Sequence, residues 1–373
     1  MTTKPKILVT SAAGRTGSAA VRQLLEKGFP VRAFVRRRDA RAAALEQAGA
    51  ELLIGDMFDY RDLRKAMVGV QRAYHCPPFT PNLLHNAMLF AVAAEEAKLE
   101  VVALMSGWNP HATHPSVITR GHWIANQIYR WMPSVDVIHV NPGLFAFDYL
   151  LGLPAIVHFG QFMAPFGDGL NAPPSNEDIA RVATSVLAEP ASHIGKNYRP
   201  TGPELISPQD VAGILGKVLE RKVTYKNVPF KMFSKAAVAQ GYPLSDIAHL
   251  RYYAEELRAG AFGVGAPTDH VRDVSGVEPE GFASIAQRYA QDPSLVHPAL
   301  KIGSRLEAIG FLVKMMATPA PDLDAWEHDR GYPLLSDPVL SQDSVEWRAT
   351  AERRQLNLLP DPQSLTPVQK AAA

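Results

Sequence analysis

The stretch KILVTSAAGRTGSAAVRQLLEKG, residues 6–28, decides the fold. Residues 6–10 form a short apolar run typical of a buried strand, and apolar side chains recur at helical spacing over residues 18–27 before Gly28 ends the helix. A turn of small residues joins the two. This order is typical of a turn that holds a dinucleotide pyrophosphate, because the amides and dipole at a helix N-terminus attract negative charge.

The turn departs from the usual glycine pattern at one position. Ser11 stands where the tight bend normally requires glycine, and a serine held at positive φ costs about 1 kcal/mol. Taken alone, the turn fits an ordinary Ala/Gly loop as well as a phosphate site. Its interpretation as a cofactor site therefore depends on the rest of the chain.

The alternation of strand and helix continues up to about residue 145. Helical patterns alternate with apolar runs typical of strands, which cover residues 31–35, 51–54, 72–76, 101–105 and 135–140. Repeated β-α units with short connections predict an α/β fold with a doubly wound parallel sheet of Rossmann type. The pattern changes after Pro142-Gly143, where helices begin to dominate.

This change gives the expected domain organisation. We expect an NAD(P)-binding Rossmann domain over residues 1–145 and a mixed segment over residues 146–293, which completes the sheet and forms a smaller, mostly helical substrate lobe. Residues 294–373 form a C-terminal extension. Its apolar residues Leu306, Ile309, Val313 and Met316 recur at helical spacing, so we expect this face to be buried, either closing the nicotinamide pocket as a lid or holding a homodimer.

Composition excludes several functional classes. Of the 373 residues, 47% are hydrophobic and 20% charged, which is ordinary for a globular protein. The 38 basic and 37 acidic residues nearly balance, so the total charge attracts neither nucleic acid nor a membrane, and we expect neither as a partner. The single cysteine, Cys76, permits no intramolecular disulfide, and the N-terminus lacks the pattern of a signal peptide. We therefore expect a cytoplasmic protein.

Residues 144–166 form a long apolar stretch, but Asp148, Gly152 and Pro154 interrupt it, which argues against a membrane span. We interpret the stretch as the wall of an apolar pocket, because aromatic side chains are concentrated there. They are Phe145, Phe147, Tyr149, Phe159, Phe162 and Phe166. The residues that we expect to line the substrate pocket are Trp108, Asn141, Phe145, Phe147 and Tyr149.

Basic residues after the second strand predict the cofactor. Residues 36–38 are all arginine, at the place where an acid would bind a free ribose 2′-hydroxyl and an arginine would bind a 2′-phosphate. This favours NADPH over NADH, although a solvated basic turn is the alternative. Asp56 and Met57 follow the third strand and are expected to flank the adenine, whereas Pro77 follows the fourth and is expected along the nicotinamide ribose.

At this point the chain resembles the NmrA-like branch of the atypical short-chain dehydrogenase/reductases. The resemblance covers roughly residues 5–292 and rests on ILVTSAAGRTGSAAVRQLLEKG, VRAFVRR, AELLIGDMFDYRDLRKAMVGV, VVALMSG, VDVIHVNPGLF, NEDIARVATSVLAEP and GKNYRPTGPELISPQDVAGILGKVL. It implies a Rossmann domain with a small helical lobe over the nicotinamide end. The resemblance also implies that the pyrophosphate is held at Gly14, Arg15, Thr16 and Gly17, the 2′-phosphate at Arg36 and the adenine edge at Asp56.

The chain also departs from that pattern. The first glycine of the turn is Ser11, the usual arginine of the Arg-Pro-Gly turn is Asn141, and residues 294–373 lie outside the resemblance. The Tyr-x-x-x-Lys pair of classical relatives is missing, since its places fall at Ile118 and His122. The usual proton donor is therefore absent, which favours a substrate that delocalises the incoming charge.

Three residues are candidates for catalysis. Ser106, at the end of the fifth strand, stands where relatives have a substrate-binding serine, and His122 or Tyr129 could donate a proton, although each also suits a structural role. His111 and His114 lie near His122 in sequence, but no carboxylate or cysteine completes a metal site, so we expect no metal.

Two functions from different classes remain open. The first is an NADPH-dependent reductase that transfers a hydride directly to a hydrophobic, conjugated or aromatic small molecule, such as a quinone, quinone methide, enone or iminium. The second is a non-catalytic NADP(H) redox sensor of NmrA type, which the missing Tyr and Lys favour. A redox-neutral lyase or isomerase that uses the bound dinucleotide is a further alternative. The aromatic stretch favours the reductase, because a sensor needs no apolar cavity.

Overall fold

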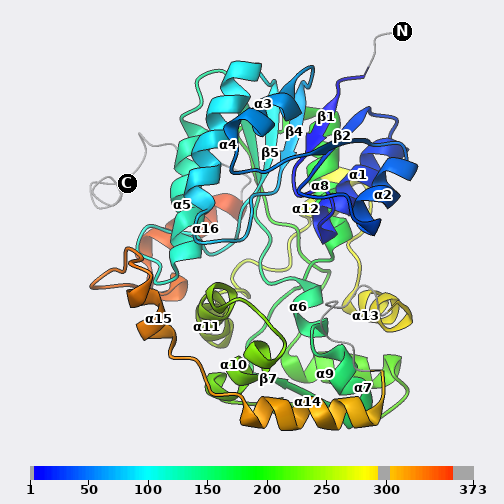
Figure 1. The fold of residues 1–373 in the computed structure, drawn as a ribbon, viewed down its shortest axis with the longest axis vertical. Coiled ribbons are helices and arrows are strands. Elements are labelled where there is room, and N and C mark those ends of the chain that lie inside the picture. Colours follow the sequence, from blue (N-terminus) through cyan, green and yellow to red (C-terminus); the bar gives the residue numbers. More distant parts are fainter. Residues whose placement is uncertain (1–3, 293–302, 356–373) are drawn as a thin grey trace.

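The computed structural model describes residues 4–292 and 303–355. A seven-stranded parallel sheet occupies the upper half of the molecule in Figure 1, and a mostly helical lobe lies below it. The strand order is β3-β2-β1-β4-β5-β6-β8. These strands are β1 (Ile7–Val9), β2 (Val31–Val35), β3 (Glu51–Ile54), β4 (Arg72–His75), β5 (Val101–Met105), β6 (Asp136–Val140) and β8 (Asn197–Tyr198). The doubly wound Rossmann sheet predicted from the sequence is confirmed.

Helices cover both faces of the sheet because its strands are apolar on both sides. One face carries α1 (Arg15–Glu26), α2 (Ala40–Gln47), α8 (Asn176–Ala188) and α12 (His270–Ser275). The other carries α3 (Tyr60–Met67), α4 (Leu83–Ala97) and α5 (Val117–Arg130). Parallel strands place all their carboxyl ends at one edge of the sheet, and that edge faces the lobe (Figure 1).

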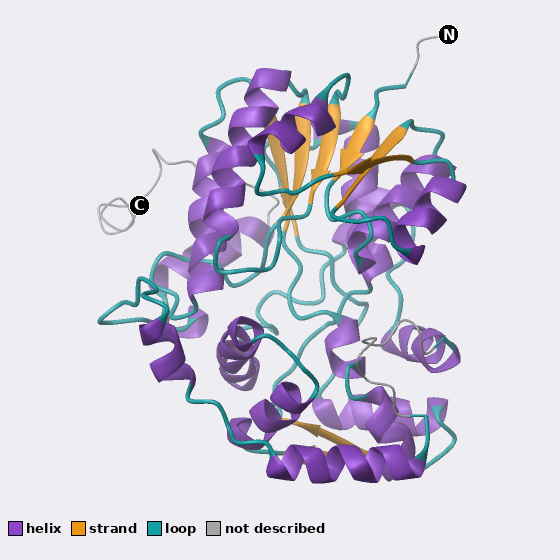
Figure 2. Ribbon diagram, in the orientation of Figure 1, coloured by secondary structure: helices purple, strands orange, loops and turns teal. Residues whose placement is uncertain are grey.

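The lobe has its own core, rich in aromatic side chains. Figure 2 shows that its only strands among the described residues are a short parallel pair, β7 (Gln161–Ala164) and β9 (Thr224–Asn227). The helices around this pair are α6 (Ala146–Leu150), α7 (Leu153–Phe159), α9 (Pro208–Val218), α10 (Phe230–Ala239), α11 (Leu244–Arg258) and α13 (Phe282–Gln291). No helix of the described residues is long and apolar enough to cross a membrane.

The C-terminal segment runs from the base of the lobe back to the Rossmann domain. Its helix α14 (Arg305–Ala317) packs on α10 and α7, and α15 (Leu323–Asp329) packs on α11. The last helix, α16 (Val345–Gln355), places Trp347 edge-to-face on Trp108, with 5.6 Å between ring centroids. Between these helices, the amide of Ser341 donates to the buried Glu256 of α11 at 3.1 Å. The segment therefore ties the two halves of the molecule together.

The apolar face of α14 named from the sequence does not pack on the lobe, and its burial in a homodimer stays a prediction. Leu306 is 81% exposed and Ile309, Val313 and Met316 are 45, 63 and 74% exposed. The helix is apolar on opposite sides, and the side that turns to the lobe is the one formed by Ala308, Phe311, Leu312 and Met315. A helix on the outside of a protein can bury only one of two such sides.

Candidate active site

The turn after β1 has the geometry of a pyrophosphate site. Ser11 has φ +49°, the strained value expected from the sequence, and its hydroxyl donates to the Cys76 carbonyl oxygen at 2.9 Å. A Cβ at Gly17 would lie 2.4 Å from the Ser11 carbonyl oxygen, so only glycine fits there. Helix α1 begins after Gly14 with no side-chain cap and no acid in its first turn. Its first amides therefore face an uncovered position suited to an anion.

The side chains beside this turn are positioned by other elements. The Thr16 hydroxyl donates to the Asn176 side-chain oxygen at 3.2 Å, so it is the Thr16 backbone amide that can serve the pyrophosphate. The exposed Arg15 guanidinium lies over the Phe147 ring, 4.3 Å from its centroid. This arginine places positive charge at the mouth of the turn.

The three arginines after β2 differ in their partners. Arg37 lies 3.7 Å from Asp39, and Arg38 pairs with Glu46. Arg36 is exposed and, within the residues that the structure describes, has no acidic partner. It is therefore the arginine best placed to bind a 2′-phosphate.

The loop after β3 lies on the same edge of the sheet. The Asp56 carboxylate is exposed and accepts the Phe58 amide at 2.9 Å, while the Met57 carbonyl oxygen accepts the Asn86 side-chain amide at 2.7 Å. These bonds order the loop and leave the second Asp56 oxygen open toward solvent.

The nicotinamide end of such a site lies at the carboxyl ends of β4 and β5. Pro77 is buried there, beside the Cys76 carbonyl group that Ser11 contacts. Ser106 is buried too, and its hydroxyl oxygen has no hydrogen-bond partner in the described part of the chain. An unpaired buried hydroxyl is costly, so Ser106 has a donor and an acceptor available for a bound group.

Tyr129 is not part of this end of the sheet. It lies in the core between the sheet and α4, 1% exposed, with its ring against His75 and Phe90. Burial raises the pKa of its phenol far above the ordinary value. The structure therefore gives Tyr129 a packing role, which argues against its use as a proton donor.

His249 interacts electrostatically with two other histidines, His114 and His122. Burial lowers the pKa of His122 to about 4, so this side chain is neutral at pH 7. His249 of α11 is also buried, and its Nδ1 lies 3.0 Å from the Ser116 hydroxyl oxygen, while its Nε2 has no partner among the described residues. Its pKa falls well below the usual value because of burial and because of His114 and His122. His249 was not foreseen from the sequence.

The predicted absence of a metal rested on the lack of a carboxylate beside the loop histidines, yet Glu256 lies beside one of them. Its carboxylate is 3.2 Å from His114 Nε2. It also accepts from Ser341 and Asn109, which holds the loop and the C-terminal segment together. Among the described residues, no group of three or more potential ligands is placed to bind a metal.

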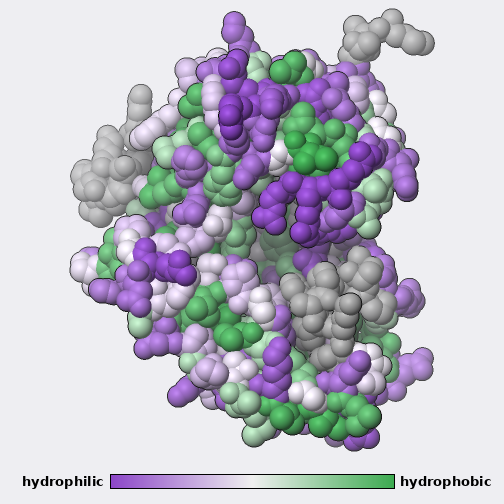
Figure 3. All heavy atoms as spheres, in the orientation of Figure 1, coloured by the Kyte–Doolittle hydropathy of each residue, from purple (hydrophilic) through white to green (hydrophobic). Residues whose placement is uncertain are grey.

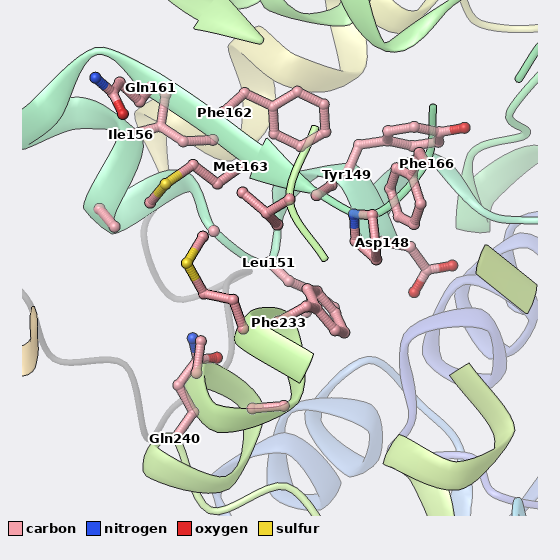
Figure 4. Close-up of a pocket in the computed structure, with 18 of the residues that line it drawn as sticks. Asp148, Tyr149, Leu151, Ile156, Gln161, Phe162, Met163, Phe166, Phe233 and Gln240 are labelled. Atoms are coloured by element: carbon pink, nitrogen blue, oxygen red, sulfur yellow. The ribbon is translucent and has the colours of Figure 1, made fainter. Parts of the chain in front are cut away.

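The lobe contains an apolar pocket with a cavity volume of about 140 Å³. Figure 4 shows Gln161 and Met163 of β7 on one side, and Phe233 of α10 with Gln240 directly after that helix on another. The base is closed by three residues of the C-terminal helix α14, which are Phe311, Leu312 and Met315. The aromatic stretch of the sequence contributes Tyr149, Phe159, Phe162 and Phe166 to the wall.

Four residues that we expected in the pocket lie elsewhere. Trp108 is 1% exposed, with its Nε1 donating to the Ala261 carbonyl oxygen, and it belongs to the core. Asn141 is buried and donates to the Asn197 side chain at 3.0 Å. Phe145 and Phe147 contact one another edge-to-face, but Phe145 packs against the core of the Rossmann domain and Phe147 against the core of the lobe, and neither lines the pocket. Tyr149 alone of the five lines it.

Asp148 is the acid of this pocket, and it lies at the opposite end from Gln161 and Gln240 (Figure 4). Burial raises its pKa to about 7, although the Phe145 amide, which donates at 3.1 Å, and the nearby Arg15 oppose that shift. A signal for this residue is present in the sequence, because Asp148 is a lone acid inside an apolar stretch.

Two residues connect the pocket to the edge of the sheet. Tyr253 lines the pocket, and its hydroxyl oxygen lies 3.9 Å from the position that a Cβ would take on Gly107, next to Ser106. At the same end, Asp148 interacts electrostatically with Arg15 of the pyrophosphate turn. A dinucleotide that extends along the edge would therefore bring its nicotinamide to the inner end of the pocket.

Comparison with known proteins shows which family the chain belongs to. The model of the NmrA-like family matches residues 3–117. Festuclavine dehydrogenase easG of Aspergillus fumigatus is 51% identical over an alignment of 207 residues that covers 48% of this chain and 69% of that protein. The chain belongs to the NmrA-like family. The matched residues hold the pyrophosphate turn, Arg36, Asp56 and Ser106, so the resemblance noted from the sequence is confirmed.

Other relatives match over most of their length. An NAD(P)H azoreductase of Xenophilus azovorans is 29% identical over 289 residues, which are 76% of this NmrA-like chain and 98% of that enzyme. The structure of the Citrobacter sp. triphenylmethane reductase complexed with NADP(H) shares the fold with a TM-score of 0.66 and 21% identity, over 76% of this chain and 99% of that one. The NmrA-like protein is an NAD(P)H-dependent oxidoreductase with a Rossmann-type site for NADP(H).

Proposed function

We propose that this NmrA-like oxidoreductase uses NADPH to reduce a conjugated or aromatic apolar small molecule, of the quinone, quinone methide, enone or iminium class, held in the lobe pocket. The observation that carries the proposal is the pocket itself, whose aromatic walls end at Asp148 and Tyr253 beside the dinucleotide edge. The similarity to an azoreductase and to a triphenylmethane reductase, which are named for azo and triphenylmethane compounds, supports it.

In this proposal NADPH is held by residues of the pyrophosphate turn and of the loops after β2 and β5. The first amides of α1 and the Arg15 guanidinium bind the pyrophosphate, and Arg36 binds the 2′-phosphate. Ser106, with its unpaired hydroxyl, orients the group that lies at the end of β5. Bound NADPH supplies a hydride to the acceptor carbon.

The chemistry of the pocket suits an acceptor that delocalises charge. Ile118 is 3% exposed and cannot donate a proton, and His122 is neutral with a pKa of about 4, so neither replaces the missing Tyr and Lys. The remaining proton source at the inner end is Asp148, which is about half protonated at pH 7 because its pKa is about 7. After hydride transfer, Asp148 delivers a proton to the reduced product and is reprotonated from solvent.

The test compares NADPH oxidation with quinones, azo and triphenylmethane dyes and simple aliphatic ketones as acceptors. We expect the conjugated acceptors to be reduced and the ketones not. Leu151→Trp, which fills the pocket, should abolish reduction while NADPH binding stays unchanged, and Leu334→Trp at an exposed position is the control. If no acceptor consumes NADPH but a protein partner binds differently with NADPH and NADP⁺, the redox-sensor function replaces the reductase.

A further inference from the structure

The exposed side of α14 is an unpartnered apolar surface. It consists of Leu306, Ile309, Val313 and Met316, which we name the α14 stripe, and the neighbouring small residues Gly310 and Ala317 add no polar group. Figure 3 shows hydrophobic surface along the lower edge of the molecule, where α14 runs. Exposed apolar side chains scattered singly are ordinary, but four in one row on one helix mark a binding surface.

Basic residues are concentrated in the part of the lobe that includes α10, on which α14 packs. Residues 217–240, which form the end of α9, the strand β9 and α10, contain six basic residues and one acid, although the whole chain carries 38 basic and 37 acidic residues. The six are Lys217, Arg221, Lys222, Lys226, Lys231 and Lys235. The base of the lobe is therefore locally cationic, a feature that the near-neutral total hides.

Two contacts place this charge at the two ends of α14. The Lys235 ammonium group donates to the Met316 carbonyl oxygen at 2.9 Å, at the C-terminal end of the helix. At the other end, α14 packs on α7, where Arg221 donates to the Val157 carbonyl oxygen. Val157 is itself 39% exposed and extends the apolar surface toward Arg221.

An apolar helix side with basic residues near it is the pattern of a helix that lies in the interface of an anionic membrane. We propose that the α14 stripe binds the surface of an anionic lipid bilayer, with Leu306, Val313 and Met316 inserted among the acyl chains and the basic residues of this part of the lobe on the phosphate groups. The protein lies on the membrane and does not span it.

A second copy of the chain fits this surface less well. A two-fold interface would place the same cationic residues opposite themselves. The stripe also offers on the order of a few hundred Å², whereas a stable interface buries about 800 Å² on each partner. An anionic bilayer instead matches the charge and needs only the area of one helix.

The position of α14 gives the membrane contact a consequence for the pocket. Phe311, Leu312 and Met315 line the pocket from the opposite side of the same helix. The helix therefore lies between the pocket and the lipid, with one apolar side facing each, so membrane contact would act directly on the helix that forms the base of the substrate pocket. This consequence rests on the proposed function, whereas lipid binding itself does not.

The experiment is flotation of the full chain with vesicles of phosphatidylcholine alone or with 30% phosphatidylserine. We expect the protein to float with the anionic vesicles at least tenfold more than with the neutral ones, and less so as salt is raised. The double variant Leu306→Ser/Val313→Ser should lose at least tenfold in binding. Its matched control is Val277→Ser/Leu334→Ser, which changes two apolar side chains exposed elsewhere and should bind like the unchanged protein.

A charge variant tests the second half of the proposal. Lys226→Glu/Lys231→Glu should reduce flotation with anionic vesicles, and the thermal unfolding temperature should stay unchanged in all variants because every substituted side chain is exposed. No flotation of the unchanged protein, or equal flotation of the stripe variant, overturns the proposal. A dimer that the stripe variant converts to a monomer, without vesicle binding, assigns the stripe to a second copy instead. Since flotation needs no substrate, its failure is separate from failure of the reductase.

Discussion

Replacing Asp148 by asparagine tests both the electrostatics of the pocket and its chemistry. In the folded protein burial raises the pKa of this carboxyl from its ordinary value of 3.8 to about 7. Between these two values the folded state holds a proton that the unfolded state has lost, so the unchanged protein loses stability as the pH rises from about 4 to about 7. Above pH 7 the whole cost is present, and below pH 4 it is absent.

The size of the effect follows from the shift. Three pKa units correspond to about 4 kcal/mol at 1.36 kcal/mol each. Because the side chain is only half-buried, solvent screens part of this cost. We therefore expect Asp148→Asn to raise the free energy of unfolding by about 1–2 kcal/mol at pH 8 and to leave it unchanged at pH 4. Asparagine keeps an oxygen that can accept the Phe145 amide, so the start of α6 is preserved.

The assay is urea unfolding at pH 4, 6 and 8, followed by circular dichroism, with the exposed Asp337→Asn as control. The same proteins are then compared in NADPH oxidation. The rate of the unchanged enzyme should fall above pH 7 as Asp148 loses its proton, and Asp148→Asn should be slow with a flat pH profile in this range. Equal stability of Asp148→Asn and the unchanged protein at pH 8 would refute the raised pKa. A flat pH profile of the unchanged enzyme would remove Asp148 from proton transfer.

Three further predictions concern cofactor choice, the turn and the C-terminal segment. Arg36→Ala should weaken NADPH binding by roughly ten- to a hundredfold and leave NADH binding unchanged, and Arg37→Ala should have a smaller effect, as measured by fluorescence titration. Gly17→Ala should destabilise the protein by about 1–3 kcal/mol and abolish dinucleotide binding, because its Cβ would lie 2.4 Å from a backbone oxygen. The control is Gly213→Ala, whose Cβ meets no atom within 4 Å and which should be neutral or stabilising in thermal unfolding. Trp347→Ala should cost about 3–5 kcal/mol in urea unfolding because this ring is buried against the core; a loss below about 1 kcal/mol would show that α16 contributes little.

The Rossmann half could be predicted because its signals are local. Strands and helices of this half follow one another with short connections, so apolar periodicity within each segment defines the element, and the parallel sheet then fixes which loops meet. Even the backbone strain at Ser11 was visible, since the residue stands where the turn demands a positive φ and the structure gives +49°. The cofactor side of the site therefore follows from residues 6–106.

The substrate side depends on contacts between distant segments. His249 and Tyr253 belong to α11, whereas Ser106 and Gly107 follow β5, and no periodicity indicates that these two elements meet. The aromatic stretch predicted a pocket wall correctly as a whole, but the side of a short helix that each ring faces is decided by what packs on it. That is why Tyr149 lines the pocket while Phe147 packs under Arg15.

The orientation of α14 could not be predicted from the sequence for a specific reason. Both sides of the helix are apolar and both repeat at helical spacing, so hydrophobic periodicity cannot choose between them. The choice follows from shape, because Ala308 is small enough to let the helix approach the lobe closely while Phe311 and Met315 fill the base of the pocket. Turning the helix over would place the longer Leu306, Ile309 and Val313 against the lobe in place of the small Ala308. The side with the longer, exposed Leu306 and Met316 is then the one left for a surface outside the protein, which is what the vesicle experiment measures.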